Sequence, residues 1–167
     1  GTRGLINSPQ TGEPMRAIVY KDYGDPAVLQ LTDRAAPEPA RDEVLIRVAA
    51  AGVNPIDARL RGGEMKGLLP GGFPRIPGYD VAGEVIGGGA RSPFKLGERV
   101  LALLDHLYGG GYAEIAVCTH SSAALIPDGM TYEHAAALPL AGSTALQSLR
   151  DHGRIKAGDS VLVNGAS

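Results

Sequence analysis

Short apolar segments, separated by turns rich in glycine and proline, run through the first three quarters of the chain. Segments of this kind at regular spacing, with few helix signals between them, predict a closed or nearly closed β-barrel. The segment 43–50 is apolar almost without interruption, which favours burial on both faces. The predicted strands cover residues 15–20, 29–32, 43–50 and 81–86, with two more lying within 94–103 and 109–117.

One short helix is predicted between residues 54 and 63. Asn54 can cap its N-terminus, Pro55 suits the first helical position, and Asp57 complements the positive end of the helix dipole. The glycine pair that ends the segment supplies a left-handed stop. Local chemistry alone is satisfied by a well-capped surface helix with no further role.

The pattern changes after the turn Pro127-Asp128-Gly129. A mainly β block followed by helix, helix and a short apolar strand indicates a domain boundary near residues 127–142. Pro139 breaks the first of these helices, and the strand runs into Gly165-Ala166-Ser167. The predicted elements are helices over 131–138 and 143–152 and a strand over 160–164.

Composition excludes several classes of protein. The chain has 167 residues, a formal net charge of −2 and scattered Lys and Arg, which predicts no affinity for nucleic acid or for anionic lipid. No apolar segment approaches the roughly 20 residues of a membrane-spanning helix. Cys118 is the only cysteine, so a reducing compartment is expected and the protein is predicted to be cytoplasmic. Residues 1–14 show no packing pattern, and we interpret them as a disordered extension.

Two segments resemble a known family, the medium-chain dehydrogenase/reductase superfamily: GVNPIDARLRGG (52–63) and PGYDVAGEV (77–85). They match it where that superfamily divides by mechanism. Its zinc alcohol dehydrogenases carry a cysteine in place of Asn54 and a His-Glu pair in place of Tyr79-Asp80. Its zinc-free quinone oxidoreductases resemble the sequence as it stands here.

An ordered series of further motifs extends this resemblance over nearly all of residues 15–167. It implies a GroES-like β-barrel catalytic domain over 15–127. Residues 128–167 would then be the first helices and strand of a Rossmann-type dinucleotide-binding domain, which is truncated here. The 167-residue chain alone is therefore expected to be a poor catalyst, and the full-length protein a homodimer.

The resemblance also implies hydride transfer from NADPH to a small-molecule quinone or enone. Asn54 and Thr144 would bind the cofactor, and Tyr79 would form a wall of the acceptor cleft. A carboxamide and a hydroxyl can each hydrogen-bond a ligand without changing charge. From the residues alone, an asparagine at the position of Asn54 is more often just a helix cap, and Thr144 is more often a second-turn helix residue. Tyr79 and Asp80 are neighbours in an extended segment, so their side chains should point in opposite directions.

Two further features bear on the chemistry. Arg59 stands where relatives often carry a tyrosine, and it could face solvent, contact a phosphate or narrow the choice of acceptor. Catalytic zinc needs three His, Cys or carboxylate ligands, whereas the histidines are isolated and Cys118 stands alone. No zinc site is predicted. The isolated histidines are His106, His120, His134 and His152.

Two other functions remain open at this point. The chain could be a GroES-like binding or interaction module without catalytic activity. It could also be an enoyl or alkenal reductase that acts on a longer substrate.

Overall fold

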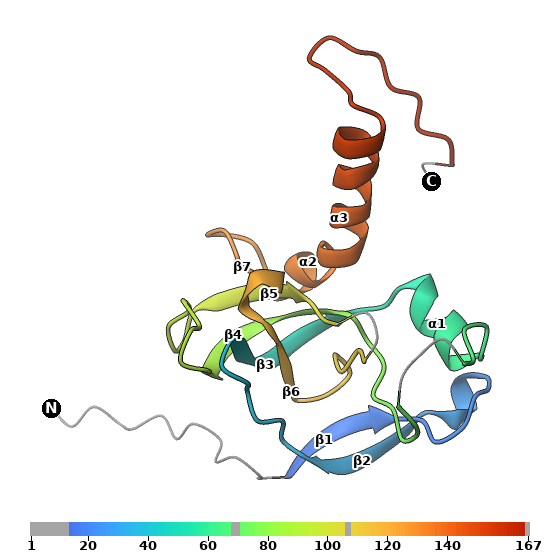
Figure 1. Ribbon diagram of the computed structural model, residues 1–167, viewed down its shortest axis with the longest axis vertical. Coiled ribbons are helices and arrows are strands. Elements are labelled where there is room, and N and C mark those ends of the chain that lie inside the picture. Colours follow the sequence, from blue (N-terminus) through green and yellow to red (C-terminus); the bar gives the residue numbers. More distant parts are fainter. Residues whose placement is uncertain (1–13, 68–70, 106–107, 166–167) are drawn as a thin grey trace, which may run out of the picture.

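The computed structural model describes residues 14–67, 71–105 and 108–165, and within these ranges it is mainly strand with short helices (Figure 1). The strands are β1 (Pro14–Val19), β2 (Gln30–Ala35), β3 (Glu43–Gly52), β4 (Asp80–Gly88), β5 (Arg99–Leu103), β6 (Ile115–Thr119) and β7 (Ala123–Leu125). The α-helices are α1 (Pro55–Arg61), α2 (Tyr132–Ala136) and α3 (Pro139–Gln147). Two 3-10 turns and one π-helical turn complete the set: η1 (Pro26–Val28), η2 (His120–Ser122) and η3 (Ser148–His152).

Strands β1 and β2 form an antiparallel hairpin that pairs along its whole length, with Pro14 opposite Ala35. Exposed and buried residues alternate at the start of β1, which is the period of a strand with one face on the core. The strand predicted over 15–20 and its hairpin partner over 29–32 are both confirmed. Residues 1–13 lie outside the described part of the chain.

The other five strands form one antiparallel sheet in the order β6-β3-β4-β5-β7. The strands predicted in 43–50, 81–86, 94–103 and 109–117 are therefore present. Strand β7 was not predicted, because three residues are too short to show a period. The main core lies on this sheet and consists of Val44, Ile46, Val81, Val85, Val100, Ala102, Leu104, Ala116 and Cys118.

The strand pairing among the described residues does not form a complete ring. Strands β6 and β7 are the two edges of the five-stranded sheet. The hairpin reaches the rest of the fold through isolated bridges, Ala17 with Ala113 and Tyr20 with Arg75. The mainly β class is thus confirmed, with an open ladder rather than continuous pairing around a barrel.

Burial along β3 differs from the prediction. Val44, Leu45 and Ile46 are buried in succession, but exposed and partly buried residues alternate from Arg47 onward. The charged group of Arg47 lies at the surface, 3.8 Å from a carboxylate oxygen of Glu84 on β4. The prediction that both faces are buried was therefore wrong for the second half of β3, because this half turns one face to solvent.

Helix α2 is the first of the two helices predicted after residue 127, and it packs on the sheet. Thr131 caps it by accepting a hydrogen bond from the backbone N–H of His134 at 3.3 Å. Ala135 and Ala136 pack against Ala82 of β4 in a small apolar cluster. Helix α2 therefore lies on the strands that precede it.

Helix α3 begins at Pro139, four residues earlier than predicted. Proline lacks an N–H and has a fixed φ. Pro139 therefore ends the preceding helix and also suits the first position of α3. The helix continues as η3 to His152, which agrees with the predicted end. In Figure 1, α3 extends away from the sheet.

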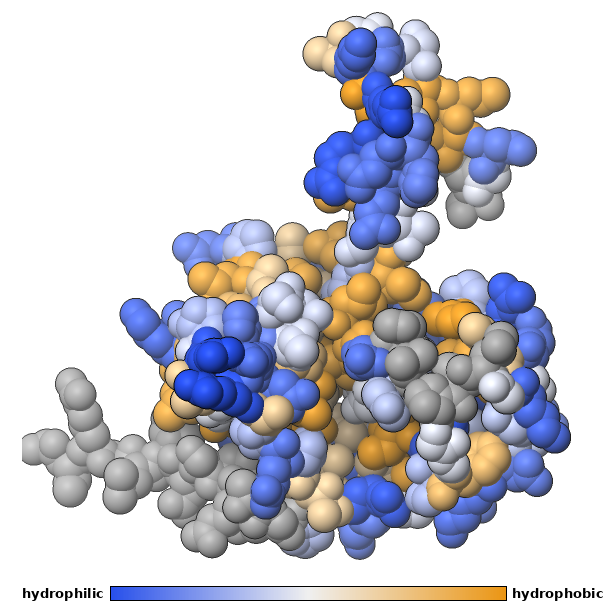
Figure 2. All heavy atoms as spheres, in the orientation of Figure 1, coloured by the Kyte–Doolittle hydropathy of each residue, from blue (hydrophilic) through white to orange (hydrophobic). Residues whose placement is uncertain are grey.

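The strand predicted over 160–164 is absent, and this expectation was wrong. Within the described residues no strand lies beside this segment, and an apolar segment forms a stable strand only where a neighbour accepts its hydrogen bonds. Leu162 is 93% exposed as a result. Figure 2 shows hydrophobic surface in this C-terminal part of the molecule. Among the described helices, none has the length and apolar character needed to cross a bilayer.

Strands β3 and β4 approach each other so closely at Gly83 that a side chain there would collide with the backbone oxygen of Arg47. We expect Gly83→Ala to lower the free energy of unfolding by about 1–3 kcal/mol, because the strands must move apart. Gly72→Ala is the matched control, since a Cβ at Gly72 would meet nothing within 4 Å. Urea denaturation measures both, and equal stability of the two variants would contradict the close packing.

Candidate functional site

Asn54 lies at the turn between β3 and α1, at the N-cap position that the sequence predicts. Pro55 occupies the first helical position, and Gly63, with φ of 87°, follows the helix in the left-handed region. The side chain of Asn54 also has a hydrogen-bond partner within the protein. Its Nδ2 donates a hydrogen bond of 2.9 Å to Oδ2 of Asp80, 26 residues further along the chain.

Asp80 is the first residue of β4 and is only 1% exposed. Its second oxygen, Oδ1, accepts a hydrogen bond of 2.9 Å from the backbone N–H of Leu140, in the first turn of α3. Burial raises the pKa of Asp80, while the hydrogen bonds from Asn54 and Leu140 lower it in part. One buried carboxylate thus contacts the start of α1 and the start of α3 together.

Asp57 is a second buried carboxylate, 4% exposed, in the first turn of α1. It accepts hydrogen bonds from the backbone N–H of Asn54 at 2.7 Å, the backbone N–H of Gly78 at 3.2 Å and the phenol of Tyr112 at 3.3 Å. Burial raises the pKa of the Tyr112 phenol, and Asp57 raises it further. Asp57 was predicted only as a complement to the helix dipole, whereas it also joins α1 to the segment that leads into β4.

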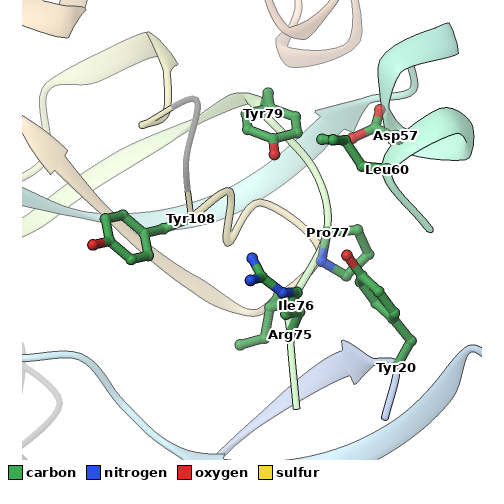
Figure 3. Close-up of a pocket in the computed structure, with 8 residues that line it drawn as sticks. All are labelled: Tyr20, Asp57, Leu60, Arg75, Ile76, Pro77, Tyr79 and Tyr108. Carbon is green, nitrogen blue, oxygen red and sulfur yellow. The ribbon is translucent and has the colours of Figure 1, made fainter. Parts of the chain in front are cut away.

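Tyr79 lies on the other side of this segment. It lines a small pocket with a cavity volume of about 10 Å³ together with Asp57, and Figure 3 shows the pocket residues as sticks. Small-molecule sites usually enclose roughly 300–1,000 Å³, so this pocket is far too small to hold such a ligand by itself. The other lining residues are Tyr20, Leu60, Arg75, Ile76, Pro77 and Tyr108.

Burial raises the pKa of Tyr79 to about 12, and the neighbouring Tyr20 and Asp57 add to the shift. The phenol is therefore protonated at neutral pH. Asp80, the next residue, forms its hydrogen bonds with Asn54 and Leu140 instead. This arrangement agrees with the expectation that the two neighbouring side chains point in opposite directions and do not act as a pair.

Thr144 lies on the exposed part of α3. Its hydroxyl donates a hydrogen bond of 2.7 Å to the backbone oxygen of Leu140, one turn earlier in the helix. The hydroxyl oxygen still has lone pairs with which it could accept a hydrogen bond from a ligand. Cofactor binding by Asn54 and Thr144 stays a prediction. The two residues are nevertheless connected, because Thr144 bonds the backbone of Leu140, and Leu140 and Asn54 both donate to Asp80.

Arg59 faces solvent with a side chain that is 63% exposed, and it forms an ion pair of 2.6 Å with Glu64. Of the three possibilities left open for this residue, the solvent-facing one agrees with the structure. Cys118 is buried on β6, and burial raises the pKa of its thiol to about 12. The thiol is therefore protonated at neutral pH and not a nucleophile.

The donor groups around Asn54 do not suit zinc. They are two carboxylates, phenols and backbone N–H groups, whereas catalytic zinc sites combine histidine, cysteine and carboxylate ligands. Within the described ranges no three His, Cys, Asp or Glu side chains gather to hold a metal ion. His106 lies outside those ranges.

Comparison with known proteins agrees with this fold. A family model for the alcohol dehydrogenase GroES-like domain matches residues 40–128. The chain is 41% identical over 160 residues to a chloroplastic quinone-oxidoreductase homolog of Spinacia oleracea, covering 92% of this chain and 49% of that protein. It is 40% identical over 158 residues to the quinone oxidoreductase of Homo sapiens, covering 92% of this chain and 46% of that protein.

Solved structures give the same picture. The quinone oxidoreductase from Coxiella burnetii matches with a TM-score of 0.79 and 33% identity, over 88% of this chain and 47% of that chain. The Escherichia coli quinone oxidoreductase complexed with NADPH matches with a TM-score of 0.74 and 30% identity, over 82% of this chain and 41% of that chain. The chain thus spans about half the length of the curated relatives it matches.

The fold and the matched region define a GroES-like domain. The chain belongs to the alcohol dehydrogenase GroES-like domain family, within the quinone oxidoreductase-like branch of the medium-chain dehydrogenase/reductase superfamily. The resemblance inferred from the motifs is confirmed.

The buried phenol of Tyr79 should make stability depend on alkaline pH. In the unfolded chain this phenol ionises near pH 10, whereas in the folded protein its pKa is about 12. Between these values the unfolded state binds fewer protons, so the free energy of unfolding falls as the pH rises from about 10 to about 12. We expect Tyr79→Phe to make this fall shallower, as measured by urea denaturation across that range.

Tyr108→Phe is the matched control, because it removes a phenol from the same pocket whose residue is 62% exposed. A Tyr79→Phe variant with the same alkaline slope as the parent protein would contradict the buried position of Tyr79.

Proposed function

We propose that this chain is the catalytic-domain portion of an NADPH-dependent, zinc-independent reductase that transfers a hydride to a quinone or an enone. The observation that carries the proposal is the hydrogen bond between Asn54 and buried Asp80. It sets an uncharged carboxamide where, by the resemblance, zinc alcohol dehydrogenases carry a cysteine ligand. The names of the relatives and the NADPH complex of the Escherichia coli structure support the same reaction.

The described residues can perform distinct tasks in such a reaction. Bound NADPH would supply the hydride. Asn54 and Thr144 can hydrogen-bond the cofactor without adding charge, and their fixed geometry lowers the entropy cost of binding. Tyr79 forms a protonated wall of the acceptor cleft, and a reduced quinone oxygen can take its proton from water.

The chemistry around Asn54 supports zinc independence. The Nδ2 group of Asn54 and the backbone N–H of Leu140 each donate to one oxygen of Asp80. Both oxygens of this carboxylate therefore already have partners within the protein. A cytoplasmic location and a homodimeric full-length protein complete the proposal.

The test is NADPH oxidation by the complete gene product, with a quinone, a short enone and a long-chain alkenal offered in parallel. We expect the quinone or the short enone to be reduced, at the same rate with and without a metal chelator. Faster reduction of the long-chain alkenal would favour the alkenal reductase instead. Absence of both NADPH binding and turnover would favour a binding module, and loss of activity with the chelator would refute zinc independence.

Asn54→Ala should weaken NADPH binding by the complete gene product about tenfold, because a lost polar contact of about 1.4 kcal/mol corresponds to that factor. Val53→Ala is the matched control, since this neighbouring side chain belongs to a residue that is 80% exposed. Fluorescence titration with NADPH measures both dissociation constants. Equal constants for the parent protein and the Asn54→Ala variant would contradict the assignment.

A further inference from the structure

Four residues from three separate parts of the sequence are joined by a continuous series of hydrogen bonds. Asn54 Nδ2 donates to Asp80 Oδ2 at 2.9 Å, and the backbone N–H of Leu140 donates to Asp80 Oδ1 at 2.9 Å. The hydroxyl of Thr144 then donates to the backbone oxygen of Leu140 at 2.7 Å. This series, called the Asp80 link below, connects the two residues to which the proposed function assigns cofactor contacts.

We propose that Asp80 is a positioning residue, which fixes the side chain of Asn54 and the first turn of α3 in one geometry for cofactor binding. The inference rests on the proposed function for the identity of the ligand. It goes beyond it in assigning a role to a residue that is 1% exposed and therefore does not itself meet the ligand.

The chemistry of a carboxylate gives the Asp80 link its direction. An ionised carboxylate only accepts hydrogen bonds, so the nitrogen end of the Asn54 carboxamide must face Asp80. The same carboxylate supplies an acceptor for an N–H in the first turn of α3, a group without a partner inside its helix. One carboxylate thus holds both the side chain of Asn54 and the first turn of α3.

Close packing around Asp80 leaves little room for other arrangements. A Cβ on Gly52, at the end of β3, would lie 2.6 Å from the backbone oxygen of Ala136 and 2.8 Å from Cβ of Asp80. Three elements therefore meet around this side chain: β3, β4 and α2. Interiors packed in this way deform little, so the position of the Asp80 carboxylate is transmitted to its partners.

Asp80→Asn tests the Asp80 link because the variant keeps the size of the side chain. A carboxamide offers one accepting oxygen and one donating nitrogen, so it cannot accept from Asn54 and Leu140 in the way that two carboxylate oxygens do. Glu84→Gln is the matched control. It neutralises a carboxylate on the same strand whose side chain is 48% exposed.

The first measurement is amide hydrogen exchange in the 167-residue chain. We expect Asp80→Asn to speed exchange at the Leu140 N–H about tenfold or to change the NMR shifts of the Asn54 side-chain amide, whereas Glu84→Gln changes neither. Unchanged exchange and unchanged shifts in Asp80→Asn would overturn the proposal, whether or not NADPH binds.

The second measurement is a double-mutant cycle on NADPH affinity in the complete gene product. With Asp80 present, Asn54→Ala and Thr144→Ala together should weaken binding at least about threefold less than the product of their separate effects, because the two sites are coupled. In the Asp80→Asn background the two effects should multiply. A merely structural role would lower thermal stability and leave this coupling unchanged, and that result would overturn the proposal.

The two measurements separate the two hypotheses. A parent protein that fails to bind NADPH would refute the proposed function, while the exchange experiment would still decide whether Asp80 holds Asn54 and α3 together. Tight NADPH binding without coupling between Asn54 and Thr144 would support the proposed function and refute the positioning role.

Discussion

The buried carboxylate of Asp80 is the constraint on which the functional part of this structure depends. A charge removed from water is costly unless hydrogen bonds replace its hydration, and at 1% exposure the partners must come from the protein. Asn54 and the backbone of Leu140 supply them. The turn after β3 and the start of α3 must therefore come together for β4 to begin where it does.

The neighbouring residues Tyr79 and Asp80 belong to two different parts of the site. Asp80 is hydrogen-bonded toward Asn54 and α3, while Tyr79 lines the pocket on the other side with a phenol whose pKa is about 12. Asp57 belongs to both parts, because it lines that pocket and also accepts the backbone N–H of Asn54. Buried carboxylates thus hold the surrounding elements together, and the side chains that we propose to contact the cofactor, Asn54 and Thr144, are uncharged.

The parts of the fold and the site that depend on local signals could be predicted from the sequence. The parts that depend on contacts between distant residues could not. The helix after Asn54 could be predicted because its cap, proline and glycine stop are all local. The strand expected over 160–164 failed because a strand depends on a neighbour that the segment itself does not encode. The role of Asp80 was missed for the same reason, since its partner Leu140 lies 60 residues away. The position of Asp57 in the first turn of α1 was the one signal for its contact with Asn54.

The same geometry bears on the division of this superfamily by metal. A carboxylate at the position of Asp80 needs a positive or hydrogen-bonding partner, and a metal ion or an amide can each fill that need. Here the Asn54 amide and an N–H of α3 engage both oxygens. These two donors replace hydration that the buried carboxylate would otherwise lose. At the position where, by the resemblance, zinc alcohol dehydrogenases carry a cysteine, Asn54 therefore supplies a hydrogen-bond donor to the buried carboxylate.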